Sequence, residues 1–306
     1  MTVLVTGGAG FIGSHLVEQL LSAGRKVRVL DNLSMGKKEN LPLAVPDLEF
    51  IEGDIRDPMT VEKCVAGVSA IVHLAAVASV QASIDDPLST HQSNFDGTLH
   101  LLEAARKHQV GRFLYACSAA VYGDTEVLPV PETLIPKPLS PYAVDKLAGE
   151  YYLLYYFNKH GLNATSFRFF NIYGPRQDPS SPYSGVISIF VDRLRAGGEV
   201  TVFGDGKQTR DFVYVKDLAT LLAEALERTD LGGAVTNVGT GRECSLLQLL
   251  DALESISGKT LKRNFADPRV GDIRYSRADV TRLQSLFSRI PATPIQQGLK
   301  ALLDYA

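Results

Sequence analysis

Two residues able to exchange a proton, Tyr142 and Lys146, lie four positions apart in the segment SPYAVDK, residues 140–146. Serine is a favoured helix N-cap and proline is tolerated at the first helical position, so the segment predicts a helix start. Side chains four apart share one face of a helix, where an ammonium can act on a phenol. A phenol that works as a base near pH 7 needs its pKa lowered by roughly 3. Because Y-x-x-x-K also occurs by chance in many helices, the pair alone does not establish a site.

A glycine-rich turn near the start of the chain has the spacing of a dinucleotide-binding loop. The apolar segment 3–5 runs into TGGAGFIG, residues 6–13, and an amphipathic helix is expected to follow. These glycines satisfy both G-x-G-x-x-G and G-x-x-G-x-x-G between a strand and a helix. Backbone without Cβ atoms can approach a pyrophosphate, which then lies on the N–H groups at the helix start. The alternative interpretation is a glycine turn needed only for packing.

An acidic residue follows at a position where such folds bind a ribose. The second predicted strand, residues 27–30, ends in Asp31. Its spacing from Gly13 is close to that at which a carboxylate binds the adenosine ribose hydroxyls. A carboxylate there would repel a 2′-phosphate, so the sequence favours NAD over NADP. Asp31 as a simple turn residue is the alternative.

The elements that must position these residues alternate between strands and helices. Strands are expected at 3–5, 27–30, 48–52, 70–74, 113–117 and 163–170, with helices between them that include long ones at 87–108 and from 141 onward. This rhythm predicts an α/β fold with a doubly wound parallel sheet, in which chemistry lies at the carboxyl ends of strands. Ser118 follows the fifth strand at that edge. The helix after Lys146 continues as YYLLYYF, apolar on nearly every side, and is expected to be widely buried; a dimer interface is one place that could bury it.

The remaining residues predict a smaller α/β lobe. After residue 173 the rhythm becomes irregular, with helices expected near 186–195, 218–226 and 246–256 and a strand at 235–238. We expect a Rossmann domain over 1–173, to which 211–240 returns, and a substrate-binding lobe over 174–306.

Composition narrows the class of protein. The 306 residues are 45% hydrophobic and 21% charged, with a net charge of −3, which is ordinary for a globular protein and gives no reason to expect nucleic acid or a membrane as partner. Three separated cysteines and six scattered histidines suggest neither a disulfide framework nor a metal site. With no leader or long apolar run visible, a cytoplasmic setting is the expectation.

Taken together, the glycine turn, Asp31, Ser118 and the Tyr142–Lys146 pair make the chain resemble the extended short-chain dehydrogenase/reductase superfamily. The nucleotide-sugar epimerase and dehydratase branch is the most similar, over essentially the whole length. The resemblance implies the catalytic triad Ser118, Tyr142 and Lys146. It also implies cofactor contacts from Gly7, Gly10, Phe11, Ile12, Gly13, Asp31, Asn32, Asp54, Ile55, Ala75, Ala76 and Asn94, together with Tyr142 and Lys146.

The resemblance further implies the substrate contacts. Besides Ser118 and Tyr142, these are Ser79, Gln81, Ser83, Asn171, Val202, Phe203, Arg210, Arg269, Asp272 and Ser276. The two arginines offer forked donors suited to a diphosphate, although a lone arginine is more often a surface charge. The expected ligands are NAD and a UDP-sugar, with no metal, and a homodimer is the expected assembly.

The residues after Ser118 distinguish between reactions of the branch. Dehydratases and decarboxylases carry acidic residues there, whereas this chain has Ala119 and Ala120, which cannot transfer protons. Reversible redox at one carbon remains, namely 4-epimerisation through a 4-keto sugar. In this mechanism Tyr142 takes the proton of the 4-hydroxyl, Ser118 hydrogen-bonds that oxygen, and Lys146 holds the ribose and lowers the pKa of the phenol. A net dehydrogenase or reductase with the same triad is an alternative.

Ser276 bears on the identity of the sugar. Members of the branch restricted to UDP-glucose and UDP-galactose often have a bulky tyrosine at the aligned position, and a serine leaves room for an N-acetyl group at C2. The segment SVQASI, residues 79–84, resembles the substrate loop of UDP-N-acetylhexosamine epimerases. We therefore expect UDP-GlcNAc/UDP-GalNAc as the preferred pair, with UDP-glucose/UDP-galactose as the alternative. Tyr275 could instead fill the gap.

Overall fold

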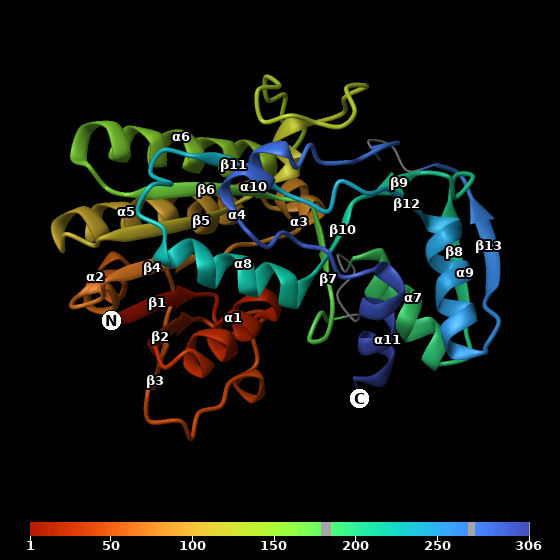
Figure 1. Cartoon of the computed structure of the whole chain (residues 1–306), viewed down its shortest axis with the longest axis horizontal. Helices are drawn as coiled ribbons and strands as arrows, with labels where there is room; N and C mark the ends of the chain where they lie inside the picture. The colour runs from red at the N-terminus through yellow and green to blue at the C-terminus, as the bar shows by residue number, and fades with distance from the viewer. Residues whose placement is uncertain (179–184, 269–272, 306) are drawn as a thin grey trace. The chain divides into compact units, whose positions relative to one another are not determined.

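The computed structural model describes residues 1–178, 185–268 and 273–305, and Figure 1 shows its course. The chain divides into two compact units. Unit 1 contains Met1–Val121, Pro136–Arg168 and Ala219–Thr236, and unit 2 contains Tyr122–Ile135, Phe169–Leu218 and Asn237–Ala306. These bounds differ from the expected ones in three places, because 122–135 and 169–173 belong to unit 2 and the returning segment spans 219–236 rather than 211–240.

The first half of the chain alternates strands and helices. Its elements are β1 (Thr2–Thr6), α1 (Phe11–Ser22), β2 (Lys26–Asp31), a 3₁₀ turn (Lys38–Asn40), β3 (Leu48–Glu52), α2 (Pro58–Val65), β4 (Ala70–His73), α3 (Val80–Asp85), α4 (Pro87–His91), a π-helical turn (Gln92–Asp96), α5 (Gly97–Lys107), β5 (Arg112–Ser118), a 3₁₀ turn (Ala119–Tyr122), α6 (Pro141–His160) and β6 (Ala164–Phe169).

The second half has shorter strands. Its elements are β7 (Asn171–Tyr173), α7 (Val186–Arg195), β8 (Glu199–Phe203), β9 (Thr209–Arg210), β10 (Phe212–Tyr214), α8 (Val215–Glu227), β11 (Val235–Val238), β12 (Cys244–Ser245), α9 (Leu246–Ser257), β13 (Lys262–Ala266), α10 (Thr281–Leu286) and α11 (Ile295–Asp304).

The central sheet has the expected doubly wound topology. Among the described residues, seven strands run in the order β11-β6-β5-β4-β1-β2-β3, and β1 to β5 pair in parallel. The order reverses after β1, which brings the loops after β1 and β4 to one edge, where such sheets bind ligands. Helix α6 packs on β5, and α1 packs on β1 and β2 (Figure 1).

The helix expected over 87–108 is interrupted. It consists of α4, the π-helical turn and α5 in succession, and π-turns inside helices frequently occur at functional sites. The buried Asn94 lies in the turn and hydrogen-bonds the backbone of Val77 through both ends of its amide, at 2.8 and 3.0 Å. The spacing of apolar residues does not reveal this wider turn, because one extra residue barely changes the helical periodicity of the sequence.

Unit 2 has its own apolar core. The strand pairs β10-β7 and β13-β8 are parallel and β12-β9 is antiparallel. Helices α7, α9 and α11 pack around a core that includes Phe190, Leu249 and Leu299. Unit 2 therefore has the hydrophobic centre that a separate α/β lobe requires.

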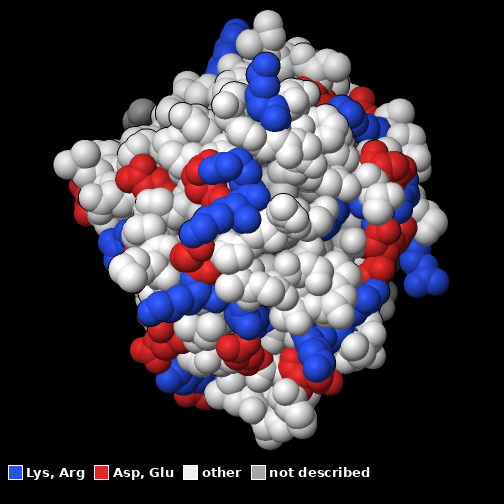
Figure 2. Space-filling model, turned by 90° about the vertical axis from the view of Figure 1, so that its left-hand side faces the viewer, with Lys and Arg blue, Asp and Glu red and all other residues white. Residues whose placement is uncertain are grey.

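The surface charges of unit 1 are mixed in sign. Figure 2 shows basic and acidic side chains interspersed over the face on the left of Figure 1. On α2 and α5, Lys107 pairs with Glu62 at 2.6 Å and Arg106 pairs with Glu103 at 2.9 Å. In the part of the chain that the structure describes, no helix combines the length and apolarity of a membrane span, and no group of three or more His, Cys, Asp or Glu side chains could hold a metal ion.

Candidate active site

The glycine turn between β1 and α1 is shaped for close contacts. Gly7 has φ of 69°, and a Cβ there would lie 2.8 Å from the backbone nitrogen of Ala75. A Cβ on Gly13 would lie 2.1 Å from the carbonyl oxygen of Gly7. Gly10 caps α1 without a side-chain acceptor, so the first helical N–H groups have no protein side chain to satisfy them. A helix start of this kind suits a pyrophosphate.

Asp31 lies at the end of β2 and holds the turn in place. Its carboxylate accepts hydrogen bonds from the backbone of Ala9 and of Leu33, each at 2.9 Å. Burial raises the pKa of Asp31, and the hydrogen bonds from Leu33 and Ala9 oppose that increase. An acceptor that is already oriented by two backbone donors is well suited to ribose hydroxyls.

The rest of the predicted cofactor set lies around the same sheet edge. Asn32 donates to Asp54 at 3.0 Å, and Arg56 pairs with Asp54 at 2.8 Å. Although burial opposes it, the Arg56 guanidinium lowers the pKa of Asp54 to about 2. Asp54 and Arg56 line a hollow of about 500 Å³ together with His100, whose ring bonds the carbonyl of Ile55 at 3.1 Å.

A buried polar chain that sequence reasoning missed supports the loop after β4. His73 links the hydroxyls of Thr6 and Thr98, at 2.7 and 2.9 Å. The Thr6 hydroxyl accepts from Ala75 at 3.3 Å, and Thr98 donates to the carbonyl of Asn94 at 2.6 Å. The predicted contacts Ala75 and Asn94 are therefore tied to one network. His73, a polar residue in the otherwise apolar strand β4, is the sequence feature that could have indicated this network.

The predicted triad lies on two neighbouring elements of unit 1. Ser118 ends β5, and its hydroxyl accepts from the backbone of Ala120 at 3.1 Å. Ser140 caps α6 by accepting from Ala143 at 3.2 Å, as the sequence predicts. The Lys146 ammonium lies 6.0 Å from the centre of the Tyr142 ring and 5.1 Å from that of Tyr115. Helix α6 therefore presents the phenol and the ammonium together.

Burial dominates the electrostatics of this pair. It raises the pKa of Tyr142 to about 12, although a hydrogen bond with Ser118 opposes the rise. It also lowers the pKa of Lys146 to about 8. Burial thus outweighs any lowering of the pKa of the phenol by Lys146, because both groups leave water on folding. Additional positive charge beside the phenol is needed for it to ionise near neutral pH.

The predicted sugar-loop residues of unit 1 have local partners. The Ser79 hydroxyl caps α3 by accepting from Ala82 at 2.9 Å, and the buried Ser83 donates to the carbonyl of Val80 at 2.6 Å. Gln81 is exposed and donates to Asp85 at 2.8 Å. The hydroxyls of the two serines therefore stabilise the backbone of this loop.

The predicted substrate residues of unit 2 differ in accessibility. Asn171 is exposed, whereas Phe203, Arg210 and Ser276 are half-buried. Val202 belongs to the apolar core and is 0% exposed, so a substrate contact through its side chain is wrong and only its backbone could take part. Arg269 and Asp272 lie outside the described residues.

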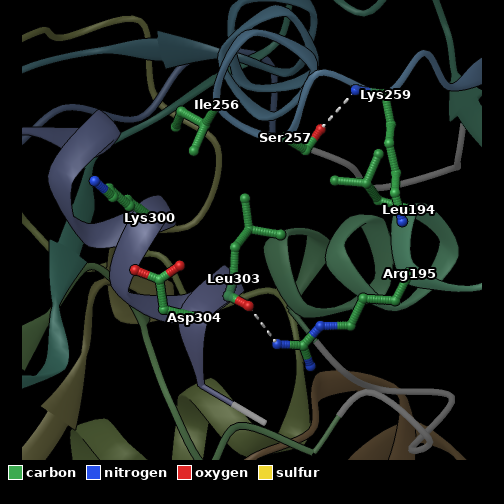
Figure 3. A pocket seen from close by; sticks show the side chains of 8 residues that line it. All are labelled: Leu194, Arg195, Ile256, Ser257, Lys259, Lys300, Leu303 and Asp304. Carbon is green, nitrogen blue, oxygen red and sulfur yellow. Dashed lines mark hydrogen bonds between the residues drawn. The ribbon is translucent and has the colours of Figure 1, made fainter.

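A separate pocket of about 250 Å³ opens in unit 2 among α7, α9 and α11 (Figure 3). Arg195 at its rim donates to the carbonyls of Leu302 and Leu303, at 2.9 and 3.1 Å. The lining includes none of the described residues predicted to bind substrate. We therefore do not assign chemistry to it.

The chain is similar to known proteins over nearly its whole length. The sequence profile of the NAD dependent epimerase/dehydratase family matches residues 3–239. A UDP-glucose 4-epimerase of Mycolicibacterium smegmatis is 40% identical over 100% of this chain and 98% of its own length. The structure of a UDP-N-acetylglucosamine 4-epimerase from Methanobrevibacter ruminantium matches with a TM-score of 0.96 and 35% identity, covering 99% of this chain and 97% of that chain.

A UDP-glucose 4-epimerase of Thermus thermophilus, solved in complex with NAD, matches with a TM-score of 0.92 and 40% identity over 100% of this chain and 98% of that chain. The fold, the glycine turn and Asp31 agree with NAD as the cofactor. The chain belongs to the NAD-dependent epimerase/dehydratase family.

Proposed function

We propose that the protein is a UDP-sugar 4-epimerase that acts preferentially on the UDP-GlcNAc/UDP-GalNAc pair. The observation that carries the reaction type is the pair Ala119 and Ala120, which follows Ser118 directly. Neither methyl group can move a proton, so elimination of water has no acid or base there. The triad is left with reversible oxidation at a single carbon, and relatives with 4-epimerase activity support this choice.

In the proposed mechanism each residue of the triad has one task. Bound NAD supplies the acceptor and donor of the hydride. Tyr142 takes the proton from the sugar 4-hydroxyl and later returns it, and Ser118 hydrogen-bonds the same oxygen. The Lys146 ammonium holds the ribose and adds positive charge beside the phenol. In unit 2, Arg210 and Asn171 are proposed to bind the diphosphate and the sugar.

The test is to incubate the purified protein with UDP-GlcNAc and with UDP-glucose separately, without added NAD, and to separate the products. Formation of UDP-GalNAc at the higher rate is the expected result. Faster formation of UDP-galactose would favour the plain hexose pair, which the names of several relatives also support. Conversion that requires stoichiometric added NAD would indicate a net dehydrogenase instead.

The surroundings of Ser276 support the acetylated pair. Tyr275 is exposed and stacks with the Arg274 guanidinium, which lies 5.6 Å from the ring centre. Arg274 also makes two bonds of 2.7 Å to Asp205. Tyr275 therefore has its own partner, which argues against its filling the space beside Ser276.

Replacing Ser276 by Tyr is expected to cut kcat/KM for UDP-GlcNAc by about a hundredfold, because the ring would occupy the space of the N-acetyl group; steric exclusion from a pocket costs a few kcal/mol. The loss with UDP-glucose should be severalfold only. Initial rates with both substrates measure the ratio, and Ser276→Ala serves as the control that keeps the space open. Equal losses on both substrates would refute the role of Ser276 in selectivity.

An aromatic face on unit 1 supports the expected homodimer. Within the single chain this helix is not widely buried, since Tyr152 and Tyr155 of α6 are 40% and 51% exposed, and Leu88 of α4 is 78% exposed. Phe95 packs edge-on against Tyr152 at 5.1 Å. Exposed aromatic clusters are typical of protein interfaces. We propose that this face contacts a second copy of the chain.

Light scattering should accordingly give twice the chain mass of 33.2 kDa. Replacing both Tyr152 and Tyr155 by Glu should yield the single-chain mass, because two charges would have to be buried at the interface. Replacing both by Phe is the control that keeps the apolar surface. A wild-type protein of single-chain mass at micromolar concentration would contradict the proposal.

A further inference from the structure

Unit 2 contains a completely buried carboxylate between two of its short strands. Asp211 follows β9 and precedes β10, and it is 0% exposed. One oxygen accepts from the backbone and from the hydroxyl of Thr240, at 2.8 and 2.6 Å. The other accepts from the backbone of Gly241 at 2.9 Å and of Ala278 at 3.1 Å. Four donors thus surround a single buried anion.

These four hydrogen bonds join three segments that are distant in sequence. Thr240 and Gly241 belong to the loop after β11, and Ala278 lies two residues after Ser276. The carbonyl of Asp211 also accepts from the backbone of Asn171 at 3.0 Å. Arg210 is the residue directly before Asp211. Three segments that carry predicted substrate residues therefore meet at Asp211, that of Ser276 at its carboxylate and that of Asn171 at its backbone carbonyl.

The packing around Asp211 leaves little freedom. A Cβ on Gly239 would lie 2.7 Å from a carboxylate oxygen of Asp211 and 2.4 Å from the Cβ of Ala278. Burial raises the pKa of Asp211, and its hydrogen bonds with Thr240, Ala278 and Gly241 oppose that increase. Buried charges persist in proteins only when such partners satisfy them. An apolar side chain that merely filled this space would lose all four bonds, and an amide would keep only the bonds that its oxygen accepts.

We propose that Asp211 is a positioning residue for nucleotide-sugar binding: its carboxylate ties the segment of Arg210 to that of Ser276 through Ala278, and its backbone carbonyl holds Asn171. This inference rests on the proposed function. A site whose contacts come from separate segments binds tightly only when those segments are held in place before the ligand arrives. Asp211 does so without touching the substrate.

The decisive variant is Asp211→Asn. Both carboxylate oxygens face backbone N–H groups, so either orientation of the amide points an NH₂ group at a donor. We expect the KM for UDP-GlcNAc and the Kd for UDP to rise by about tenfold or more, the equivalent of at least ~1.4 kcal/mol. The kcat and the amount of bound NAD should change by less than about threefold, since the triad and the glycine turn lie in unit 1.

Asp217→Asn is the matched control for general destabilisation. Asp217 is another carboxylate of unit 2, and it accepts from the backbone of Ala292 at 3.0 Å and from the backbone and hydroxyl of Thr293, at 2.8 and 2.7 Å. Its hydrogen bonds join α8 to the segment before α11. This variant should lower the melting temperature of the protein and leave the KM and the Kd for UDP unchanged.

Calorimetric titration with UDP separates the possible outcomes. If Asp211→Asn lowers the melting temperature as Asp217→Asn does but binds UDP like the wild type, Asp211 is merely structural and the inference is wrong. If Asp211→Asn fails to fold, Thr240→Val removes one of the four donors and should still raise the Kd by about threefold; an unchanged Kd would equally overturn the inference. A wild-type protein that binds no UDP would refute the proposed function itself.

Discussion

Replacing Tyr142 by Phe should lower kcat for epimerisation by about a thousandfold, within the range that general acid-base groups contribute. The variant keeps the ring over which Lys146 lies, at 6.0 Å from the ring centre, and removes only the oxygen that exchanges the proton. We expect NAD binding to depend mainly on the glycine turn and Asp31, which the substitution does not touch. The variant should therefore purify with as much NAD as the wild type.

Product formation from UDP-GlcNAc and the NAD content of the denatured protein are the two measurements. Tyr151→Phe is the matched control, because it removes a hydroxyl from the same helix at a position 55% exposed. It should retain the wild-type rate. A Tyr142→Phe variant with an undiminished rate would remove the phenol from the mechanism, and one that lost its NAD would assign Tyr142 to cofactor binding instead.

The protonation state of Tyr142 depends on pH through the charge of Lys146. Because burial raises its pKa to about 12, the phenol is protonated at neutral pH unless positive charge offsets the loss of water. The Lys146 ammonium, with a pKa lowered to about 8, keeps its charge below that pH and loses it above. The proton acceptor thus depends on a cation that is itself close to titrating, which couples the two residues.

Local patterns made the fold and the NAD region predictable. The glycine turn, the strand ending in Asp31 and the capped helix carrying Tyr142 each depend on neighbours in sequence, and the structure has all three. Strand β3 occupies the predicted residues 48–52. The π-helical turn was not predictable, because Asn94 is held there by Val77, a residue from another loop. Interactions between distant segments produce no periodic pattern in the amino-acid sequence.

Substrate residues were harder to predict for the same reason. Val202 matches a family motif, yet along β8 the even-numbered Val200 and Val202 face the core, a strand alternation that the sequence pattern could have indicated. Asp211 directly follows the predicted contact Arg210, but the four hydrogen bonds to its carboxylate come from loops whose proximity only the fold reveals. Resemblance identifies a motif, and the three-dimensional contacts decide which of its members face a ligand.

The second large effect concerns stability, at the ion pair that joins α6 to β6. Arg168 donates to Glu150 at 2.5 and 3.1 Å, and Ser166 donates to the same carboxylate at 2.8 Å. Both charged side chains are at most 5% exposed. Glu150→Ala would leave the guanidinium buried without its anion, at a cost of about 3–5 kcal/mol in the free energy of unfolding.

The midpoint of urea unfolding measures this loss, and Asp230→Ala is the control. Asp230 forms an ion pair with Arg228 at 2.6 Å, but its side chain is 60% exposed. Because solvent screens this pair, removing it should hardly change the midpoint of urea unfolding. If Glu150→Ala also left the midpoint unchanged, the buried pair would have no role in stability.

The double variant Glu150→Leu with Arg168→Leu distinguishes the pair's net contribution from the cost of breaking it. Desolvating two charges offsets much of their attraction, so replacing both by apolar side chains should restore most of the lost stability. Activity need not follow. Glu150 lies one helical turn after Lys146 on α6, and its bonds to β6 fix the rotation of the helix that presents Tyr142 and Lys146. Two leucines pack without a preferred direction. We therefore expect the double variant to be nearly as stable as the wild type but to have a lower kcat. That result would mean that the ion pair contributes more to the orientation of α6 than to the stability of the fold.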